Sequence, residues 1–190
     1  MRNPTDHQVQ QLHAALDHHD PFTVRDRALL ELLEHTGMRV GEVTSLTIHA
    51  VSSNGVPRHD LTVVGKNRHE RVIPLNAPAR QAIATILAFN AEHGFPMTPR
   101  TPLLFNKYRV PMTSRGVQLI MQHLRERADL DVPLSPHSMR HYFATSLIRR
   151  GVAVPVVSEL LGHKHVTASE HYFHTSPYEK RHAVNQLPRR

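Results

Sequence analysis

The sequence predicts a mostly α-helical α+β domain that carries one small antiparallel β-hairpin. Apolar residues recur every three or four positions through most of the chain, and capping residues stand where these segments begin. Two short β-prone runs, Leu61–Val64 and Arg71–Leu75, flank the turn segment GKNRHE and predict the hairpin. A length of 190 residues suits one domain, and the sequence has no internal repeat, low-complexity tract or dividing linker.

The helices can be placed in chain order from their caps and their apolar spacing. Thr5 and Gln8 form a capping box for the first helix, and Gly37 suits the C-cap of the second. Residues 51–60 are rich in Ser, Asn, Gly and Pro and predict a loop or turn, while Leu103–Phe105 predicts a further short strand. We expect helices over residues 5–17, 22–35, 39–46, 76–91, 113–128, 136–150, 154–161, 166–174 and 178–186.

The composition favours a polyanionic partner. The formal net charge is +7 and the pI is about 10.4, which indicates nucleic acid ahead of a membrane surface. The chain has no cysteine, which excludes disulfides and thiolate metal sites. It has no apolar run near the roughly 20 residues of a membrane span, and its first residues lack the apolar core of a signal peptide. We therefore expect a cytoplasmic protein with no membrane association.

The 17 histidines raise the possibility of metal binding. His137 and His141 are spaced i, i+4, as in zinc-binding helices. The residues between them are Ser-Met-Arg, with no glutamate, and Arg140 would repel a cation. We expect no metal site here, and we expect most of the other histidines to be solvated.

One stretch in the C-terminal third concentrates residues that suit phosphate chemistry. His137 and Arg140 are spaced i, i+3, so they share one face of a helix that a Ser-Pro pair at 135–136 begins. His163 follows in a Leu-Gly-His triplet, and Tyr172 lies nine residues further on. Helix N-termini attract anions, so this stretch predicts a phosphate site.

Two earlier segments have an ordinary and a functional interpretation. Arg39 follows a glycine turn in TGMRVGE, where it could pair with Glu42 on the next turn or bind a phosphate at a helix N-terminus. Lys66 lies in the turn of the hairpin, where a lysine is usually only solvated. Taken alone, Arg39 favours the ordinary interpretation, and Lys66 gives no indication of function.

Together, these segments resemble the catalytic domain of the tyrosine recombinases of the phage integrase family. The family carries T-G-x-R-x-x-E, a hairpin lysine followed by R-x-x-P-L, then H-x-x-R, L-G-H and a tyrosine nine residues after that histidine. The resemblance covers residues 5–187, and the motifs at these spacings are specific as a set. The positions that match the family's functional residues are Arg39, Glu42, Lys66, His137, Arg140, His163 and Tyr172.

The resemblance implies how the scissile DNA phosphate would be held. Arg39 and Arg140 would clamp its non-bridging oxygens, because a guanidinium is always charged and donates two parallel hydrogen bonds. His137 and His163 would donate to the same oxygens. Glu42 would hold the helix beside Arg39 and tune the local charge.

The resemblance also implies the covalent step. Tyr172 would be the nucleophile and form a 3′-phosphotyrosine, with His137 as the candidate base and Lys66 as the candidate acid for the leaving 5′-oxygen. Because the linkage keeps the energy of the ester, this chemistry needs no ATP. The lack of an acidic cluster in the sequence fits metal-free chemistry, and we expect no cofactor.

The expected protein is therefore a site-specific recombinase or integrase that acts on double-stranded DNA. We expect one catalytic domain over 1–190 with a tail over 175–190, and no separate N-terminal DNA-binding domain. It could be an excised domain or a short stand-alone member. The family implies a homo-oligomer, a tetramer on DNA that exchanges these tails. A type IB topoisomerase-like enzyme and a non-catalytic DNA-binding module of the same fold remain alternatives.

Overall fold

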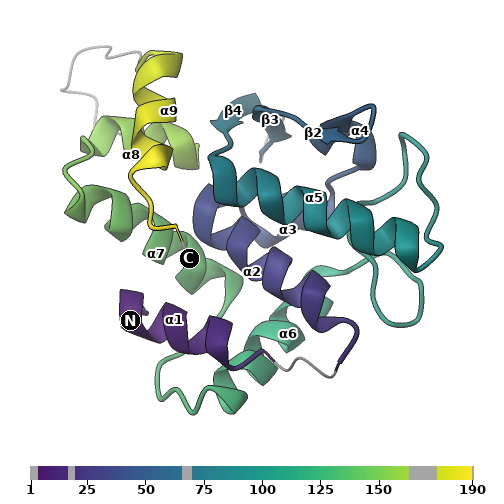
Figure 1. The fold of residues 1–190 in the computed structure, drawn as a ribbon. Helices are drawn as coiled ribbons and strands as arrows, with labels where there is room; N and C mark the ends of the chain where they lie inside the picture. Colours follow the sequence, from purple (N-terminus) through teal and green to yellow (C-terminus); the bar gives the residue numbers. More distant parts are fainter. Residues whose placement is uncertain (1–3, 17–19, 66–69, 163–174, 190) are drawn as a thin grey trace.

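The computed structural model describes residues 4–16, 20–65, 70–162 and 175–189 and shows a mostly helical α+β fold (Figure 1). The helices are α1 (Asp6–Ala14), α2 (Thr23–Thr36), α3 (Val40–Thr44), α4 (Ile48–Val51), α5 (Ala77–Glu92), α6 (Ser114–Arg127), α7 (Pro136–Arg149), α8 (Val154–Leu161) and α9 (Pro177–Asn185). The strands are β1 (Ser52–Ser53), β2 (Val56–Pro57), β3 (Asp60–Val64) and β4 (Glu70–Pro74). Among the residues described, no helix combines the length and apolar character needed to cross a membrane.

Helices α2 and α5 pack along each other through the middle of the molecule (Figure 1). Leu29 and Leu32 of α2 and Ile83 and Ile86 of α5 are fully buried there, as their helical spacing predicts. Each such side chain contributes roughly 1.5–3 kcal/mol through removal from water. Helix α2 ends at Gly37, whose φ of 57° is the left-handed conformation that its predicted C-cap role requires.

The predicted hairpin is confirmed, with each strand beginning one residue earlier than expected. Strands β3 and β4 pair antiparallel, from Asp60 opposite Pro74 to Val64 opposite Glu70. Leu61 of β3 points into the core opposite Ile73 of β4, and exposed and buried side chains alternate along β3.

Of two predictions about short segments, one was incomplete and one was wrong. Residues 51–60 contain the expected turn, at Asn54 and Gly55, but the two-residue strands β1 and β2 flank it and form a small hairpin. Both turn residues have positive φ, 51° and 78°, and an Asn-Gly pair reverses the chain in this way. The expected strand at Leu103–Phe105 is reduced to an isolated bridge between Phe105 and Pro111, since a proline cannot extend the hydrogen-bond ladder.

Helices α7, α8 and α9 enclose a second apolar cluster beside the main core (Figure 1). Helix α7 belongs to both, because Tyr142 packs into the main core and Phe143 into the second one. A Cβ atom on Gly37 would lie 2.5 Å from a ring carbon of Phe143, so only glycine allows α2 to end this close to α7. The helix expected over 166–174 lies outside the described residues.

Most described histidines are at least partly exposed, but two are buried with polar partners. His13 Nε2 lies 3.0 Å from Glu34 Oε2, which links α1 to α2. His35 Nδ1 lies 3.0 Å from the side-chain amide of Asn76. The helical spacing of their apolar neighbours could have indicated this burial.

Candidate functional site

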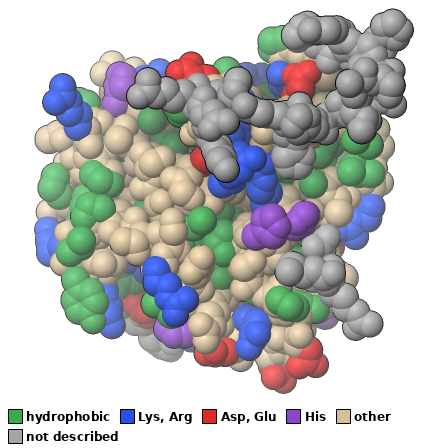
Figure 2. Space-filling view, turned by 180° about the vertical axis from the view of Figure 1, so that it is seen from behind, with side chains coloured by type: hydrophobic (Ala, Val, Ile, Leu, Met, Phe, Trp, Pro, Cys, Tyr) green, Lys and Arg blue, Asp and Glu red, His purple; other side chains and the backbone are tan. Residues whose placement is uncertain are grey.

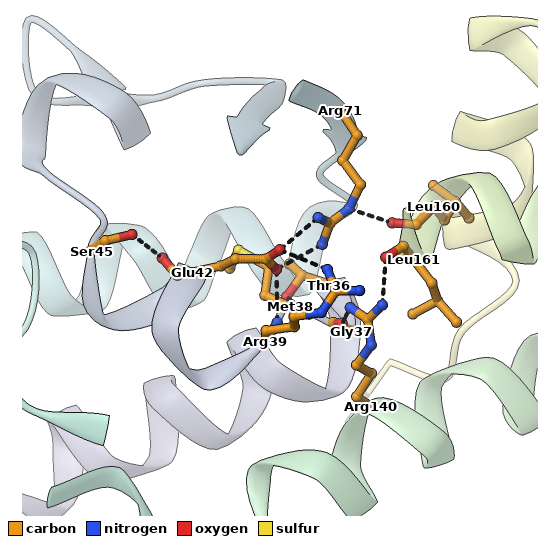
Figure 3. A network of polar contacts seen from close by, with 10 residues as sticks. All are labelled: Thr36, Gly37, Met38, Arg39, Glu42, Ser45, Arg71, Arg140, Leu160 and Leu161. Carbon is orange, nitrogen blue, oxygen red and sulfur yellow. Dashed lines mark hydrogen bonds and ion pairs between the residues drawn. The ribbon is translucent and has the colours of Figure 1, made fainter. Parts of the chain in front are cut away.

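Three arginines from separate parts of the chain lie close together, and two of them bond the same carboxylate (Figure 3). Arg39 immediately precedes α3, Arg71 lies on β4 and Arg140 lies on α7. The carboxylate belongs to Glu42 in the first turn of α3. This grouping joins segments that are about a hundred residues apart in the sequence, and it lies where the two apolar clusters meet.

The carboxylate of Glu42 accepts four hydrogen bonds. Arg71 donates two, Nη1 to Oε1 at 2.7 Å and Nη2 to Oε2 at 2.8 Å. Arg39 donates Nη1 to Oε1 at 3.1 Å and its backbone N–H to Oε2 at 2.8 Å. Burial would raise the pKa of Glu42, but these donors lower it from 4.5 to about 2. Glu42 is therefore a firmly ionised anchor at the start of α3.

Arg140 is buried without a comparable partner. Its guanidinium donates to the carbonyl oxygens of Gly37, at 2.6 Å, and of Leu161. Within the described part of the chain, no carboxylate lies within ion-pair distance of it. Burial and then repulsion from Arg39 and Arg71 lower the pKa of Arg140 from 12.5 to about 10, so it is still protonated at neutral pH. An incoming anion would relieve this unfavourable charge.

The cluster reaches solvent through Arg39. Its side chain is 43% exposed, against 10% for Arg71. Basic and histidine side chains gather near the centre of the face shown in Figure 2. The backbone N–H of Arg39, at the start of α3, already donates to Glu42. The attraction for an anion therefore comes from the guanidinium groups and not from the end of this short helix.

His137 and His141 lie on the exposed side of α7 and contact each other. Their Nε2 atoms are 2.8 Å apart, and their rings are nearly perpendicular at 86°. One proton between the two nitrogens makes this hydrogen bond, so both rings cannot be protonated in this geometry. Partial burial, His137 and Arg140 lower the pKa of His141. In the residues described, no group of three or more His, Asp or Glu side chains could hold a metal ion.

The structure brings together part of the predicted site. Arg39, Arg140 and Glu42 meet as described above, and the alternative ion pair between Arg39 and Glu42 is present. His137 lies in the first turn of α7, three residues before Arg140. The remaining predicted residues, Lys66, His163 and Tyr172, lie outside the described residues.

Sequence reasoning assigned no role to Arg71, although it matched a family position. Its Nε donates to the carbonyl oxygen of Leu160 at 2.9 Å, in addition to the two bonds with Glu42. A Cβ atom on Gly162 would lie 2.9 Å from Cδ of Arg71, which shows how closely α8 ends against this side chain. The match of Arg71 to the motif R-x-x-P-L was the available signal in the sequence. A motif position does not reveal that the side chain binds Glu42 and Leu160.

Comparisons with known proteins identify the family of this chain. The model of the phage integrase family matches residues 3–179. Tyrosine recombinase XerD of Halalkalibacterium halodurans is 34% identical over 158 residues, which are 83% of this chain and 52% of that protein. Tyrosine recombinase XerC of Bacillus subtilis is 36% identical over 172 residues, which are 89% of this chain and 55% of that protein. The chain thus spans about half the length of these curated relatives.

Solved structures share the fold. XerA recombinase has a TM-score of 0.75 at 22% identity, over 100% of this chain and 66% of that one. The integrase of mycobacterium phage Brujita has a TM-score of 0.74 at 22% identity, over 99% and 58% of the two chains. The Tn1549 transposon integrase in complex with circular intermediate DNA has a TM-score of 0.67 at 18% identity, over 96% and 64%. With its family motifs, its fold and the match over residues 3–179, this chain belongs to the phage integrase family.

Proposed function

We propose that this chain is the catalytic domain of a site-specific tyrosine recombinase that cleaves and rejoins double-stranded DNA. The observation that carries the proposal is the arginine cluster, in which Arg39 and Arg71 bond the carboxylate of Glu42 and the nearby guanidinium of Arg140 has only backbone carbonyl partners among the described residues. A phosphodiester is the anion that such a cluster fits, because it presents two non-bridging oxygens to the planar donors. The net charge of +7 supports attraction to a DNA backbone.

The proposed reaction begins when Arg39 and Arg140 bind the non-bridging oxygens, with His137 and His163 as further donors. The Tyr172 oxygen attacks phosphorus and its proton passes to His137. The bond between phosphorus and the 5′-oxygen breaks, and Lys66 gives that oxygen a proton. The 3′-phosphotyrosine that forms is then attacked by the 5′-hydroxyl of a partner strand, which reverses the same steps.

The relatives favour recombination over the two alternatives. XerC and XerD are named as tyrosine recombinases, and the Tn1549 neighbour is a transposon integrase held in complex with DNA. A type IB topoisomerase-like enzyme would relax one duplex, whereas a recombinase joins two. A non-catalytic module would have no need for the tyrosine at position 172. We further propose assembly as a tetramer on DNA, with exchange of the segment 175–190 between neighbours.

A covalent adduct tests the proposal directly. Incubation with nicked suicide DNA should leave a protein–DNA adduct that survives denaturant and forms in the presence of EDTA. Tyr172→Phe should form no adduct. An adduct that persists in this variant, or that maps to Tyr142 or Tyr178, would refute the assignment. Tyr142 is not expected to react, because it is buried and its hydroxyl donates to the carboxylate of Asp6.

The partner reaction separates the alternatives. A substrate pair with two differently labelled duplexes should give a joined product that carries both labels. Relaxation of supercoiled DNA without a joined product would favour the topoisomerase-like alternative, and DNA binding without any adduct would favour the non-catalytic module.

A further inference from the structure

The two arginines that bind Glu42 hold it very differently. Arg71 makes two short parallel bonds of 2.7 and 2.8 Å, between side chains that are only 10% and 6% exposed. Arg39 makes one side-chain bond of 3.1 Å, and its side chain is 43% exposed. A buried bidentate pair is the stronger of the two, since solvent competes less with it. Arg71 is thus the tight partner of Glu42, and the Arg39 side chain is the loose one.

Arg71 is itself fixed on several sides. Its backbone pairs with Val63 across the hairpin, and its Nε donates to Leu160 at the end of α8. The close approach of Gly162 leaves no space beside its Cδ. Its guanidinium is therefore already committed to Glu42 and Leu160, whereas Arg39 has only one side-chain hydrogen bond among the residues described (Figure 3).

We propose that Arg71 is a positioning residue that holds the carboxylate of Glu42 and so leaves the guanidinium of Arg39 free to move onto a phosphate oxygen. This inference rests on the function proposed above. When Arg39 turns toward the phosphate, Glu42 loses one 3.1 Å bond and keeps three, namely both bonds from Arg71 and the backbone N–H of Arg39. The buried carboxylate is never left without a cation, so the movement costs little.

Removal of Arg71 changes this balance. Glu42 would remain a buried carboxylate with Arg39 as its nearest cation, and its need for a partner would compete with the DNA phosphate for the same guanidinium. The defect of Arg71→Ala should therefore come from the negative charge of Glu42. Neutralising that charge should relieve it.

Four proteins test this inference: the wild type, Arg71→Ala, Glu42→Gln and the double variant. On nicked suicide DNA at saturating protein, Arg71→Ala should cleave on the order of 10²-fold more slowly, which is the cost of one missing phosphate donor. The double variant should recover to nearly the rate of Glu42→Gln alone. A double variant that is as slow as Arg71→Ala, or slower, would overturn the proposal.

The salt dependence of DNA binding gives a second readout, measured in a Tyr172→Phe background to prevent cleavage. Withdrawal of Arg39 from a phosphate should reduce the slope of log K against log salt by about 0.9 in Arg71→Ala. Addition of Glu42→Gln should restore the slope. If Arg71 instead contacted the DNA itself, the loss of slope would persist in the double variant, and the proposal would be wrong.

Arg25→Ala is the matched control for stability. Arg25 is also buried and also bonds a carboxylate and a backbone carbonyl, those of Asp26 and Phe105, but it is not part of the arginine cluster. Its variant should change neither the cleavage rate nor the salt slope. If Arg71→Ala does not fold, Arg71→Lys replaces it, because a lysine cannot make both bonds to Glu42.

Arg71→Lys should slow cleavage less than Arg71→Ala, and addition of Glu42→Gln should again restore the rate. If Glu42→Gln does not restore the rate, the proposal is wrong. A wild type that forms no adduct at all would instead refute the proposed function. That outcome is distinct from failure of this inference, in which the wild type is active and only the relief is missing.

Discussion

Two arginines of this protein are equally buried and have opposite surroundings. Arg25 in α2 and Arg140 in α7 are 5% and 6% exposed. Arg25 donates Nε to the carboxylate of Asp26 at 2.7 Å and Nη1 to the carbonyl oxygen of Phe105 at 2.8 Å. Its charge is thus compensated inside the fold. Nothing about this arginine calls for a ligand.

Arg140 also donates to backbone, the carbonyl oxygens of Gly37 and Leu161, but its charged neighbours include two further arginines. Arg39 and Arg71 add to the effect of burial in lowering the pKa of Arg140 to about 10. A buried charge without compensation costs stability. The comparison teaches that burial by itself does not mark a functional arginine, whereas burial among like charges points to an anion from outside the chain.

The largest expected effect is a difference in DNA cleavage rate between variants of these two arginines. Arg140→Ala should slow cleavage of suicide DNA by on the order of 10²–10³-fold, because it removes a donor to the phosphate. Arg25→Ala should leave the rate unchanged at a temperature where both variants are folded. Equal losses in the two variants would mean that Arg140 acts through the fold alone.

The next effect concerns the free energy of unfolding, for which Arg25→Ala should be the more damaging of the two variants. Arg25→Ala should lower the free energy of unfolding by about 3 kcal/mol, because Asp26 is left without its cation. Arg140→Ala should cost less, because the relief of repulsion from Arg39 and Arg71 offsets part of the loss of two hydrogen bonds. Urea unfolding at pH 7 measures both, and a larger loss for Arg140→Ala would contradict the distinction.

The acid dependence of stability sharpens the description of the cluster. The pKa of Glu42 is depressed to about 2 in the folded protein, so its stabilisation is complete above its unfolded pKa near 4.5 and is lost as the pH falls toward 2. The wild type should lose about 2–3 kcal/mol more than Glu42→Gln over this window. Glu159, whose pKa is also lowered but which is more exposed, provides a control in Glu159→Gln with a smaller difference. Parallel pH curves for wild type and Glu42→Gln would rule out the anchored carboxylate.

The smallest effect concerns the histidine pair beside the cluster. The pKa of His141 should lie below 6.5, because of partial burial, His137 and Arg140, and His137→Gln should raise it. Titration of the imidazole signals by NMR measures this shift. A pKa of His141 that does not respond to the substitution would mean that the 2.8 Å hydrogen bond is not kept in solution.

Helix caps and turns, which depend on a few adjacent residues, could be predicted well. Ser135 accepts from the backbone of Ser138 and caps α7, as the Ser-Pro pair indicated, and Thr113 caps α6 in the same way. These caps succeed because donor and acceptor lie within one turn of each other. The turn at Asn54 and Gly55 was equally local and was expected, but the Asn-Gly pair was not interpreted as the signal of a hairpin.

The chain's sequence alone determined the family motifs, the positions of Arg39 and Arg140, and most helix boundaries, because each depends on residue types at short spacings. Only the tertiary structure decided which groups meet. Arg71 reaches Glu42 across 29 residues and Leu160 across 89, and Arg140 reaches Gly37 across 103. Such contacts depend on how the hairpin, α3 and α8 pack around α7, and no periodicity along the chain encodes that packing. The excess of positive charge in the cluster is a property of that assembly.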